Sequence, residues 1–214
     1  MIKVTIYSLL TTMVTGFKIT GNINYEEAIR LFAEAFKDDP MNESIFENDN
    51  TRLEMVEAIY RFVVDCIVPE QKLNLKGAVK NKKIAGAVIF TDPENKREWT
   101  PYLIEEGRKL GEKTGEKYGR VIRDFVEHTF RYRPYVPHYY INELAVLPGY
   151  QGKGIGKSLM KYVEDLSVHH EKSKGVALDT TNPDNVPLYK HLGYKTTGKF
   201  RFHGLKGYSM FKKM

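Results

Sequence analysis

The sequence predicts a mixed α/β (α+β) fold arranged as one domain over residues 1–214. Amphipathic helical patterns alternate with short runs rich in β-branched and aromatic residues, and neither type dominates. In the last third, a strand, a glycine-rich turn, a helix and a second strand follow one another, which favours a right-handed βαβ unit. A length of 214 residues with 42% hydrophobic side chains is enough for one sizeable core but short for two ordinary domains.

Two amphipathic helices are predicted in the first third of the chain. Asn24 is a suitable N-cap for the first helix, whose apolar side chains recur at helical spacing up to Phe36. The segment 38–40 is expected to stop this helix, because its final proline disfavours helical backbone in the residue before it. The second helix is expected over about 51–68, and Pro69 is expected to end it.

Two strands and a further helix are predicted in the middle of the chain. The runs 73–80 and 84–91 have strand character, and the three polar residues between them indicate a hairpin. The stretch 92–119 is polar and is broken by prolines and glycines, so we expect a surface loop that contains helical pieces. A helix over about 118–132 follows it.

The last third has the clearest pattern, with elements that follow one another closely. A glycine-rich turn over 148–154 connects a strand to a helix, and Gly193 closes a later, shorter helix. A strand near the C-terminal end, 208–212, is a candidate for pairing across a dimer. The elements predicted here are strands over 139–146, 176–180, 194–202 and 208–212 and helices over 155–169 and 185–192.

Composition argues against several classes of protein. The formal net charge of +6 favours anionic ligands but is too dilute for the dense basic stripe of a nucleic-acid-binding protein. The single cysteine, Cys66, cannot form an internal disulfide and lies among apolar residues at helical spacing, so we interpret it as a buried structural thiol. No cluster of His and Cys has zinc-site spacing, and we expect no metal.

No stretch of the chain approaches the roughly 18 uncharged apolar residues that are needed to span a bilayer. Residues 1–14 place Lys3 before an apolar run, but the run contains hydroxyl residues and no small-residue cleavage pattern follows it. We interpret this segment as a β-prone lead-in rather than a secretory signal. A cytoplasmic location is then the default expectation.

The glycine-rich turn is a candidate anion site. A strand that leads through such a turn into a helix presents backbone N–H groups at the positive end of the helix dipole, and phosphate is their usual ligand. Gly152, Gly154 and Gly156 would let the backbone approach a bulky diphosphate, and Lys153 and Lys157 add positive charge beside it.

Spacing excludes two common nucleotide-binding loops. A Walker-type loop needs a glycine five residues before the Gly-Lys-Ser that begins at Gly156, and that position is Gln151. A dinucleotide-binding loop that begins at Gly152 would need its third glycine at Lys157. The expected ligand is therefore a different phosphate compound.

Two motifs resemble the GNAT superfamily of acyl-CoA-dependent N-acetyltransferases. The segment QGKGIG at 151–156 is similar to that family's Q/R-x-x-G-x-G/A signature. About 30 residues later, the segment 182–194 is similar to the family's asparagine-containing turn and its LYxxLGF helix. The resemblance covers 139–194 and implies a signature core over about 138–202. It also implies a GNAT-like central sheet that is mixed but mostly antiparallel, with splayed middle strands and helices on both faces.

The resemblance implies acetyl-CoA as cosubstrate. In the family, the strand that corresponds to 139–146 bulges and splays from its neighbour, and the freed backbone groups pair with the pantetheine arm. The turn amides hold the diphosphate, and an asparagine binds the arm. The implied cofactor-binding residues are Leu144, Ala145, Val146, Gln151, Gly152, Lys153, Gly154, Ile155, Gly156, Lys157, Asn182 and Asn185. For the two asparagines, a turn and an N-cap before the short helix are equally available roles.

The resemblance also implies direct attack of an amine on the thioester within a ternary complex. Tyr189 occupies the position of the family's general acid, which protonates the departing thiolate, and a packing tyrosine is the alternative. Glu143, on the strand beside the thioester, is the candidate base, with a surface or salt-bridged glutamate as the alternative. Asp179 is the second candidate base. By analogy, the N–H group of Val146 would stabilise the oxyanion.

The expected function is transfer of an acetyl group from acetyl-CoA to a primary amine of a small-molecule or peptide acceptor, and the alternative is a CoA-binding sensor without catalysis. Acceptor choice is expected to depend on the variable segments 41–50 and 92–133. Neither nucleic acid nor a membrane is expected as a partner, and a monomer and a homodimer both stay open. The tyrosines near the start of the strand are candidates for lining an acceptor pocket, but we favour half-buried packing for them: Tyr132, Tyr135, Tyr139 and Tyr140.

Overall fold

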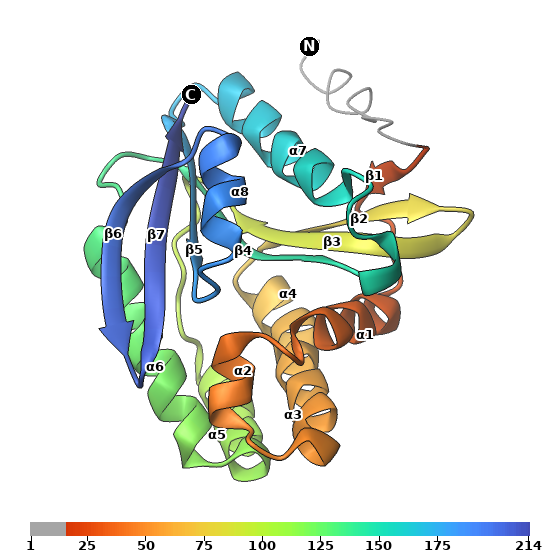
Figure 1. Ribbon diagram of the computed structural model, residues 1–214, viewed down its shortest axis with the longest axis vertical. Coiled ribbons are helices and arrows are strands. Elements are labelled where there is room, and N and C mark those ends of the chain that lie inside the picture. The colour runs from red at the N-terminus through yellow and green to blue at the C-terminus, as the bar shows by residue number, and fades with distance from the viewer. Residues whose placement is uncertain (1–15) are drawn as a thin grey trace.

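Seven strands form one sheet within residues 16–214, which are the residues that this computed structural model describes (Figure 1). The strand order is β1-β2-β3-β4-β5-β7-β6, and all neighbours are antiparallel except β4 and β5, which are parallel. The strands are β1 (Lys18–Thr20), β2 (Asn74–Lys80), β3 (Lys83–Thr91), β4 (Tyr139–Val146), β5 (Gly175–Thr180), β6 (Lys195–Phe202) and β7 (Leu205–Lys213).

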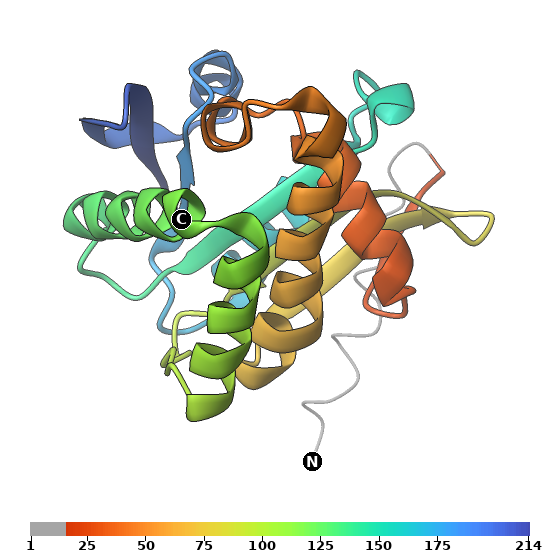
Figure 2. The same cartoon turned by 90° about the horizontal axis from the view of Figure 1, so that it is seen from below.

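Helices cover both faces of this sheet. One face carries α7, which packs on β3, β4 and β5, whereas α1, α3, α5 and α6 lie on the other side (Figures 1 and 2). The helices are α1 (Tyr25–Phe36), α2 (Pro40–Ile45), α3 (Asp49–Phe62), a π-helical segment (Val63–Ile67), α4 (Val68–Glu70), α5 (Pro101–Thr114), α6 (Glu116–Tyr132), a 3-10 turn (Pro148–Tyr150), α7 (Ile155–His169) and α8 (Asn185–His191). The mixed, mostly antiparallel sheet with helices on both faces is confirmed.

Two apolar clusters hold these layers together. Phe32 of α1 and Ile89 of β3 belong to the cluster under α1 and α3, whereas Phe90 and Leu159 belong to the cluster under α7. The neighbours Ile89 and Phe90 enter opposite clusters because successive side chains of a strand point to opposite faces. β3 is thus buried on both sides and fixes the position of its neighbour β4.

Several predicted elements are confirmed. Asn24 caps α1, since its side-chain oxygen accepts a hydrogen bond from the amide of Glu27 at 3.1 Å. β2 and β3 form the predicted hairpin, and β4, α7 and β5 form the predicted βαβ unit with parallel strands. Cys66 is buried, as expected from its apolar neighbours.

The segment 92–119, predicted as a surface loop with helical pieces, contains one long helical piece, α5, over Pro101–Thr114. Thr100 caps this helix by accepting a hydrogen bond from the amide of Leu103 at 3.3 Å. Pro101 stands in the first turn, where its missing N–H group is not needed. Packing of α5 against α3 and α6 compensates for the low helix propensity of its interior glycines.

Pro40 and Pro69 were both predicted to stop a helix, and the structure shows a further role for the first and a different role for the second. α1 ends before Pro40 as expected, but Asp39 and Pro40 also start α2, because the Asp39 carboxylate accepts a hydrogen bond from the amide of Met41 at 3.0 Å. Pro69 does not end the second helix. It lies at the start of a new helical turn after the π-helical segment, where a missing N–H group is tolerated.

The expectation that the strand at 208–212 pairs across a dimer is wrong. This strand is part of β7, which lies between β5 and β6 and has partners on both sides. Its backbone groups are therefore already used within the sheet.

The interpretation of residues 1–14 lies outside the described residues. Within 16–214, no helix combines the length and the apolar character that a membrane crossing requires.

Candidate functional site

β4 and β5 separate part-way along their length, as the resemblance implied. Their parallel pairing ends with the pair Ile141 and Leu178. Beyond it, β4 continues to Val146 against β3, while β5 continues to Thr180 against β7. The second edge of β4 at 144–146 therefore has no strand partner among the described residues and faces an opening inside the sheet.

A β-bulge at Asn142 decides which way Glu143 points. Ile141 pairs with Phe90 and Glu143 pairs with Ile89, so Asn142 is an extra residue in β4. In a regular strand, Glu143 would lie on the same face as Ile141, which packs in the cluster under α7. The extra residue moves Glu143 to the opposite face, toward α3.

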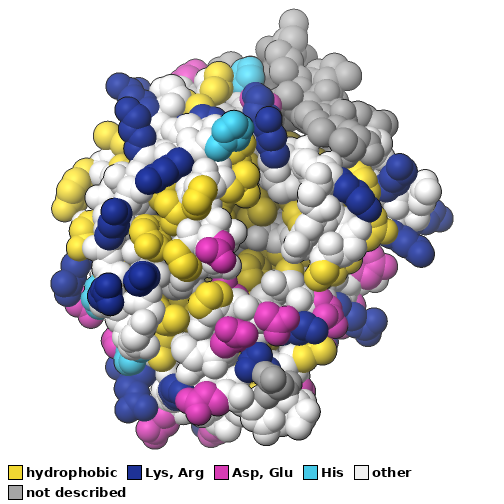
Figure 3. All heavy atoms as spheres, in the orientation of Figure 1, with side chains coloured by type: hydrophobic (Ala, Val, Ile, Leu, Met, Phe, Trp, Pro, Cys, Tyr) yellow, Lys and Arg dark blue, Asp and Glu magenta, His cyan; other side chains and the backbone are white. Residues whose placement is uncertain are grey.

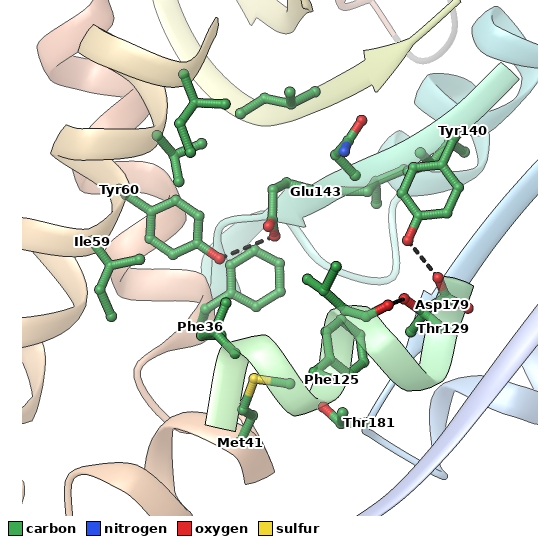
Figure 4. A pocket seen from close by; sticks show the side chains of 18 of the residues that line it. Phe36, Met41, Ile59, Tyr60, Phe125, Thr129, Tyr140, Glu143, Asp179 and Thr181 are labelled. Carbon is green, nitrogen blue, oxygen red and sulfur yellow. Dashed lines mark hydrogen bonds between the residues drawn. The ribbon is translucent and has the colours of Figure 1, made fainter. Parts of the chain in front are cut away.

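Glu143 is held by a tyrosine from α3 (Figure 4). The hydroxyl group of Tyr60 donates a hydrogen bond to Oε2 of Glu143 at 3.1 Å. Burial raises the pKa of Glu143 to about 7; the Tyr60 hydrogen bond acts in the opposite direction, and the charge of Asp39 adds to the rise. A carboxyl group with this pKa exists in both protonation states at neutral pH, which suits a proton acceptor.

Glu143 borders a cavity of about 480 Å³ that lies between the sheet and α3, α5 and α6. Figure 3 shows the surface hollowed near the middle of the viewed face, where hydrophobic side chains gather. Asp39 and Asp179 also line the cavity, and burial raises the pKa of each carboxyl group. Asp39 accepts a hydrogen bond from the hydroxyl group of Thr181 at 3.3 Å, and Asp179 accepts one from the hydroxyl group of Tyr140. The cavity is thus a partly open, largely apolar space with three carboxyl groups in its walls.

Tyr189 projects from α8 into the lining of the same cavity. Burial, with a smaller effect from the charge of Asp39, raises the pKa of Tyr189 to about 12. Its hydroxyl group is therefore protonated at neutral pH and can donate a proton. The structure brings Tyr189, Glu143, Leu144 and Asn185 together around one space, as the sequence predicted for a common site.

The turn between β4 and α7 presents open backbone amides. Gly152 (φ 73°) and Gly154 (φ 79°) have left-handed conformations that favour glycine, and a Cβ atom at either position would meet nothing within 4 Å beyond its chain neighbours. The amide of Gln151 donates to the carbonyl group of Pro148 at 3.2 Å. The amides of 152–157 donate no hydrogen bond to any described residue. The positive end of the α7 dipole is therefore open to an anion.

The longer side chains of this turn serve the turn itself. Nε2 of Gln151 donates to the carbonyl group of Val146 at 3.2 Å, and Nζ of Lys153 donates to the carbonyl group of Gly149 at 2.9 Å. The side chain of Ile155 is buried in the core. These contacts fasten the turn beside the open edge of β4 and leave the backbone amides as its free donors.

Three further predicted cofactor-binding residues, Gly156, Lys157 and Asn182, lie close to the starts of α7 and α8. Oδ1 of Asn182 accepts a hydrogen bond from the amide of Asp184 at 3.0 Å, which is the turn role that the sequence left open. Lys157 lies in the first turn of α7, and a Cβ atom at Gly156 would lie 3.6 Å from Val146 and 3.7 Å from Leu144. This spacing shows how closely α7 approaches β4. Contacts of these residues with a cofactor stay a prediction.

The family model described as Acetyltransferase (GNAT) family matches residues 32–194. This match covers most of the chain and includes the splayed strands, the glycine turn and α8. The chain belongs to the GNAT acetyltransferase family. The bulged, splayed β4 and the open amides before α7 are thus features of a GNAT protein, and the GNAT family uses acetyl-CoA as its cosubstrate.

Solved acetyltransferase structures share the fold of this GNAT protein. A structure of histone acetyltransferase HPA2 and related acetyltransferase from Corynebacterium glutamicum is 17% identical with a TM-score of 0.63, covering 92% of this chain and 96% of that one. Arylalkylamine N-acetyltransferase 2 from Aedes aegypti is 18% identical with a TM-score of 0.62, covering 92% and 98%. The apo form of an agmatine N-acetyltransferase mutant is 18% identical with a TM-score of 0.59, covering 93% and 100%. No curated protein sequence matches the chain.

Three residues of the GNAT cavity were not predicted as functional from the sequence. Tyr60 is predicted only as part of the apolar face of the second helix. A buried tyrosine hydroxyl normally needs a hydrogen-bond partner, and this requirement could have indicated a polar contact such as the one with Glu143. Asp39 is predicted only as part of a helix stop. For Tyr140, the sequence favours packing over a place in an acceptor pocket. The structure corrects this preference, because Tyr140 lines the cavity while its neighbour Tyr139 packs under α7.

Proposed function

We propose that this GNAT protein transfers the acetyl group of acetyl-CoA to a primary amine of a small-molecule or peptide acceptor, by direct attack within a ternary complex. The observation that carries the proposal is the arrangement of β4, whose open edge at 144–146 lies next to the free amides of 152–157 while Glu143 faces the cavity. The names of two structural neighbours specify agmatine and arylalkylamine acceptors, and we extend amine acetylation from them to this chain.

The residues around the opening fit the cosubstrate. The free edge at 144–146 can pair with an amide-containing arm as an added strand would, and the amides of 152–157 can hold a diphosphate at the helix N-terminus. The space beside Gly152 and Gly154 leaves room for the phosphate oxygens. Asn185 borders the cavity near Tyr189 and is proposed to contact the arm, together with Asn182.

Each proposed catalytic group has a defined task. When bound, acetyl-CoA supplies the acetyl group as a thioester, whose carbonyl carbon an amine can attack. Glu143 accepts a proton from the amine as the C–N bond forms, and Tyr189 gives a proton to the sulfur as the C–S bond breaks. The N–H group of Val146 is proposed to stabilise the negative charge on the carbonyl oxygen. Asp179 is the second candidate base, and its carboxyl group accepts a hydrogen bond from the hydroxyl group of Tyr140, as Glu143 does from Tyr60.

The direct test is turnover with a panel of amines. Purified protein is mixed with acetyl-CoA and each amine, and the release of free thiol is followed. We expect thiol release that depends on both substrates, with the acetylated amine identified by mass spectrometry. Tight binding of acetyl-CoA without turnover on any amine would instead support the CoA-binding sensor, and the absence of binding would contradict both functions.

Gly154→Val is expected to weaken acetyl-CoA binding by about a hundredfold, because the new side chain would block the amides and cost roughly two hydrogen bonds to a charged group. The left-handed conformation of Gly154 also makes valine strained there, by about 1–2 kcal/mol or more, so thermal unfolding is measured in parallel. Calorimetric titration with acetyl-CoA gives the affinity. Gly149→Ala, in the same turn but with open space and no left-handed conformation, is the control and should bind normally. Unchanged affinity in the Gly154 variant would refute the assignment of the turn.

In the unchanged protein, kcat/KM is expected to increase as the pH rises through the pKa of Glu143. Tyr60→Phe should move this increase to higher pH by about one pH unit. The variant loses a hydrogen bond to the charged carboxylate, so the pKa of Glu143 rises further. The pH–rate profile between pH 5 and 9 measures this shift. Tyr118→Phe is the matched control, since Tyr118 lines the same cavity and makes no hydrogen bond to Glu143. Identical shifts in both variants would show that Tyr60 does not act through Glu143.

A further inference from the structure

Two arginines border the cavity at the end of β4 where Tyr140 lies. Arg97 comes from the segment between β3 and α5, and Arg133 directly follows α6. The guanidinium carbon of Arg133 lies 3.9 Å from the centroid of the Tyr140 ring, and that of Arg97 lies 5.6 Å from it. Tyr140 is itself fixed by its hydrogen bond to Asp179, so the two guanidinium groups are held near one wall of the cavity.

Neither guanidinium group has an ion-pair partner within residues 16–214. Four other arginines lie within 4 Å of a carboxylate: Arg52, Arg61, Arg108 and Arg131. The remaining arginines outside the cavity lack such a partner in the described part of the chain and are exposed to solvent. Arg97 donates to the hydroxyl group of Thr91, and Nε of Arg133 is buried and donates to no described atom. A buried donor without an acceptor costs free energy, and two like charges beside one ring repel each other. Arg97 is exposed as a whole residue, but the surroundings of its guanidinium group remove enough water to lower its pKa, and the charge of Arg133 adds to this effect. An anion placed between these groups would relieve both costs.

The charges of the side chains at this end of the cavity indicate the charge of a ligand that would bind there. Arg97, Arg133 and the carboxyl group of Asp179 all line the cavity, so with Asp179 charged the balance of these three groups is a single positive charge. One carboxylate of a ligand would neutralise it, whereas a phosphate dianion would overcompensate. The fork of N–H donors in a guanidinium group also matches the two oxygens of a carboxylate.

We infer that the acceptor is a primary amine that also carries a carboxylate, which Arg97 and Arg133 bind while the amine lies at Glu143. This inference rests on the proposed function for the position of the amine. Tyr140 and Glu143 are three residues apart on β4, so their Cα atoms are about 10 Å apart along the strand, which sets the scale of the separation between the two charged ends of the acceptor. The two charges therefore lie at opposite ends of a short chain, as in an ω-amino acid. Apolar cavity residues such as Ile122 and Phe125 face the space available to its middle.

The experiment measures binding without catalysis. Trp99 is the chain's single tryptophan, it lines the cavity and it is 60% exposed, so its fluorescence reports occupancy. The full-length protein, with and without CoA, is titrated with 6-aminohexanoate, hexylamine and 1,6-diaminohexane, and calorimetry supplies the affinity if fluorescence does not change. We expect 6-aminohexanoate to bind about tenfold more tightly than either other amine, in line with one charge-assisted contact. Equal or tighter binding of hexylamine or the diamine, or no binding of 6-aminohexanoate by either method, overturns the inference.

Matched variants assign the preference to the arginines. Arg133→Gln should remove the preference for 6-aminohexanoate over hexylamine, and Arg97→Gln should reduce it independently. Arg131→Gln is the control, because Arg131 lies two positions away, outside the cavity lining, and pairs with Glu127. Far-ultraviolet circular dichroism checks that each variant is folded. If Arg131→Gln loses the preference as well, or both cavity variants retain it, the inference fails.

The outcome also separates this inference from the proposed function. A carboxylate preference in binding that comes without acetyl transfer to any amine contradicts the proposed function and leaves the arginine site standing. Acetyl transfer to hexylamine with no gain from the carboxylate gives the opposite result.

Discussion

Glu143→Gln is expected to lower kcat/KM by about a thousandfold at pH 8, because an amide cannot accept the proton of the attacking amine. The activity of the unchanged protein should rise with pH through about 7, since Glu143 acts as a base only after it has lost its own proton. That rise should be absent from the variant. Steady-state rates from pH 5 to 9 measure both effects.

The same substitution is expected to stabilise the protein at alkaline pH. The pKa of Glu143 is raised on folding from 4.5 to about 7, so its favourable contribution is complete below pH 4.5 and is lost as the pH rises through 7. At about 1.4 kcal/mol for each pH unit, this loss amounts to about 3 kcal/mol. Glutamine does not titrate, so the melting temperature of the variant should exceed that of the unchanged protein at pH 8 but not at pH 4.5.

Asp179→Asn is the control for the kinetic measurement. Asp179 lines the same cavity and is the second candidate base. If Asp179→Asn abolishes the pH-dependent rise and Glu143→Gln preserves it, the assignment of the base to Glu143 is wrong.

Tyr189→Phe is expected to lower kcat by about a hundredfold or more while the KM for acetyl-CoA changes little, because the lost hydroxyl group acts only as the thiolate departs. Phenylalanine keeps the ring that packs near Tyr194, with centroids 6.2 Å apart, so the melting temperature should be preserved. Initial rates and thermal unfolding are measured on the same preparation.

A second measurement separates proton donation by Tyr189 from simple packing. The loss in Tyr189→Phe should shrink with an acetyl thioester whose thiol is more acidic than that of CoA, because such a thiolate departs without a proton. An equal loss with both thioesters, or a parallel fall in stability and acetyl-CoA affinity, would mean that Tyr189 is structural.

The parts of the site that the sequence predicted well are those built from neighbouring residues. The conformation of the glycine turn at 151–156 depends on the residues of the turn itself. Glycine favours the left-handed backbone seen at Gly152 and Gly154, and this backbone determines where the amides point. The strand before it and the helix after it follow from side-chain pattern. The placement of the turn beside the opening between β4 and β5 then follows from the βαβ connection.

The acceptor side was less predictable because it depends on contacts between distant segments. Tyr60 and Glu143 are 83 residues apart, and no spacing rule relates them. The bulge at Asn142 reverses the alternation of β4, so a regular pattern would direct Glu143 to the wrong face. Arg97 and Arg133 lie in the segment 92–133. The sequence indicates that this segment influences which acceptor is bound, but it does not indicate which of its side chains reach the cavity.

The opening between β4 and β5 places unpaired backbone at the centre of the sheet, whereas most sheets confine such groups to their outer strands. If the pantetheine arm occupies the opening as proposed, saturation at a hundred times the dissociation constant adds about 2.7 kcal/mol to folding stability. Resistance to proteolysis would then follow the metabolic supply of acetyl-CoA. The abundance of the enzyme would be tied to the availability of the compound that it consumes.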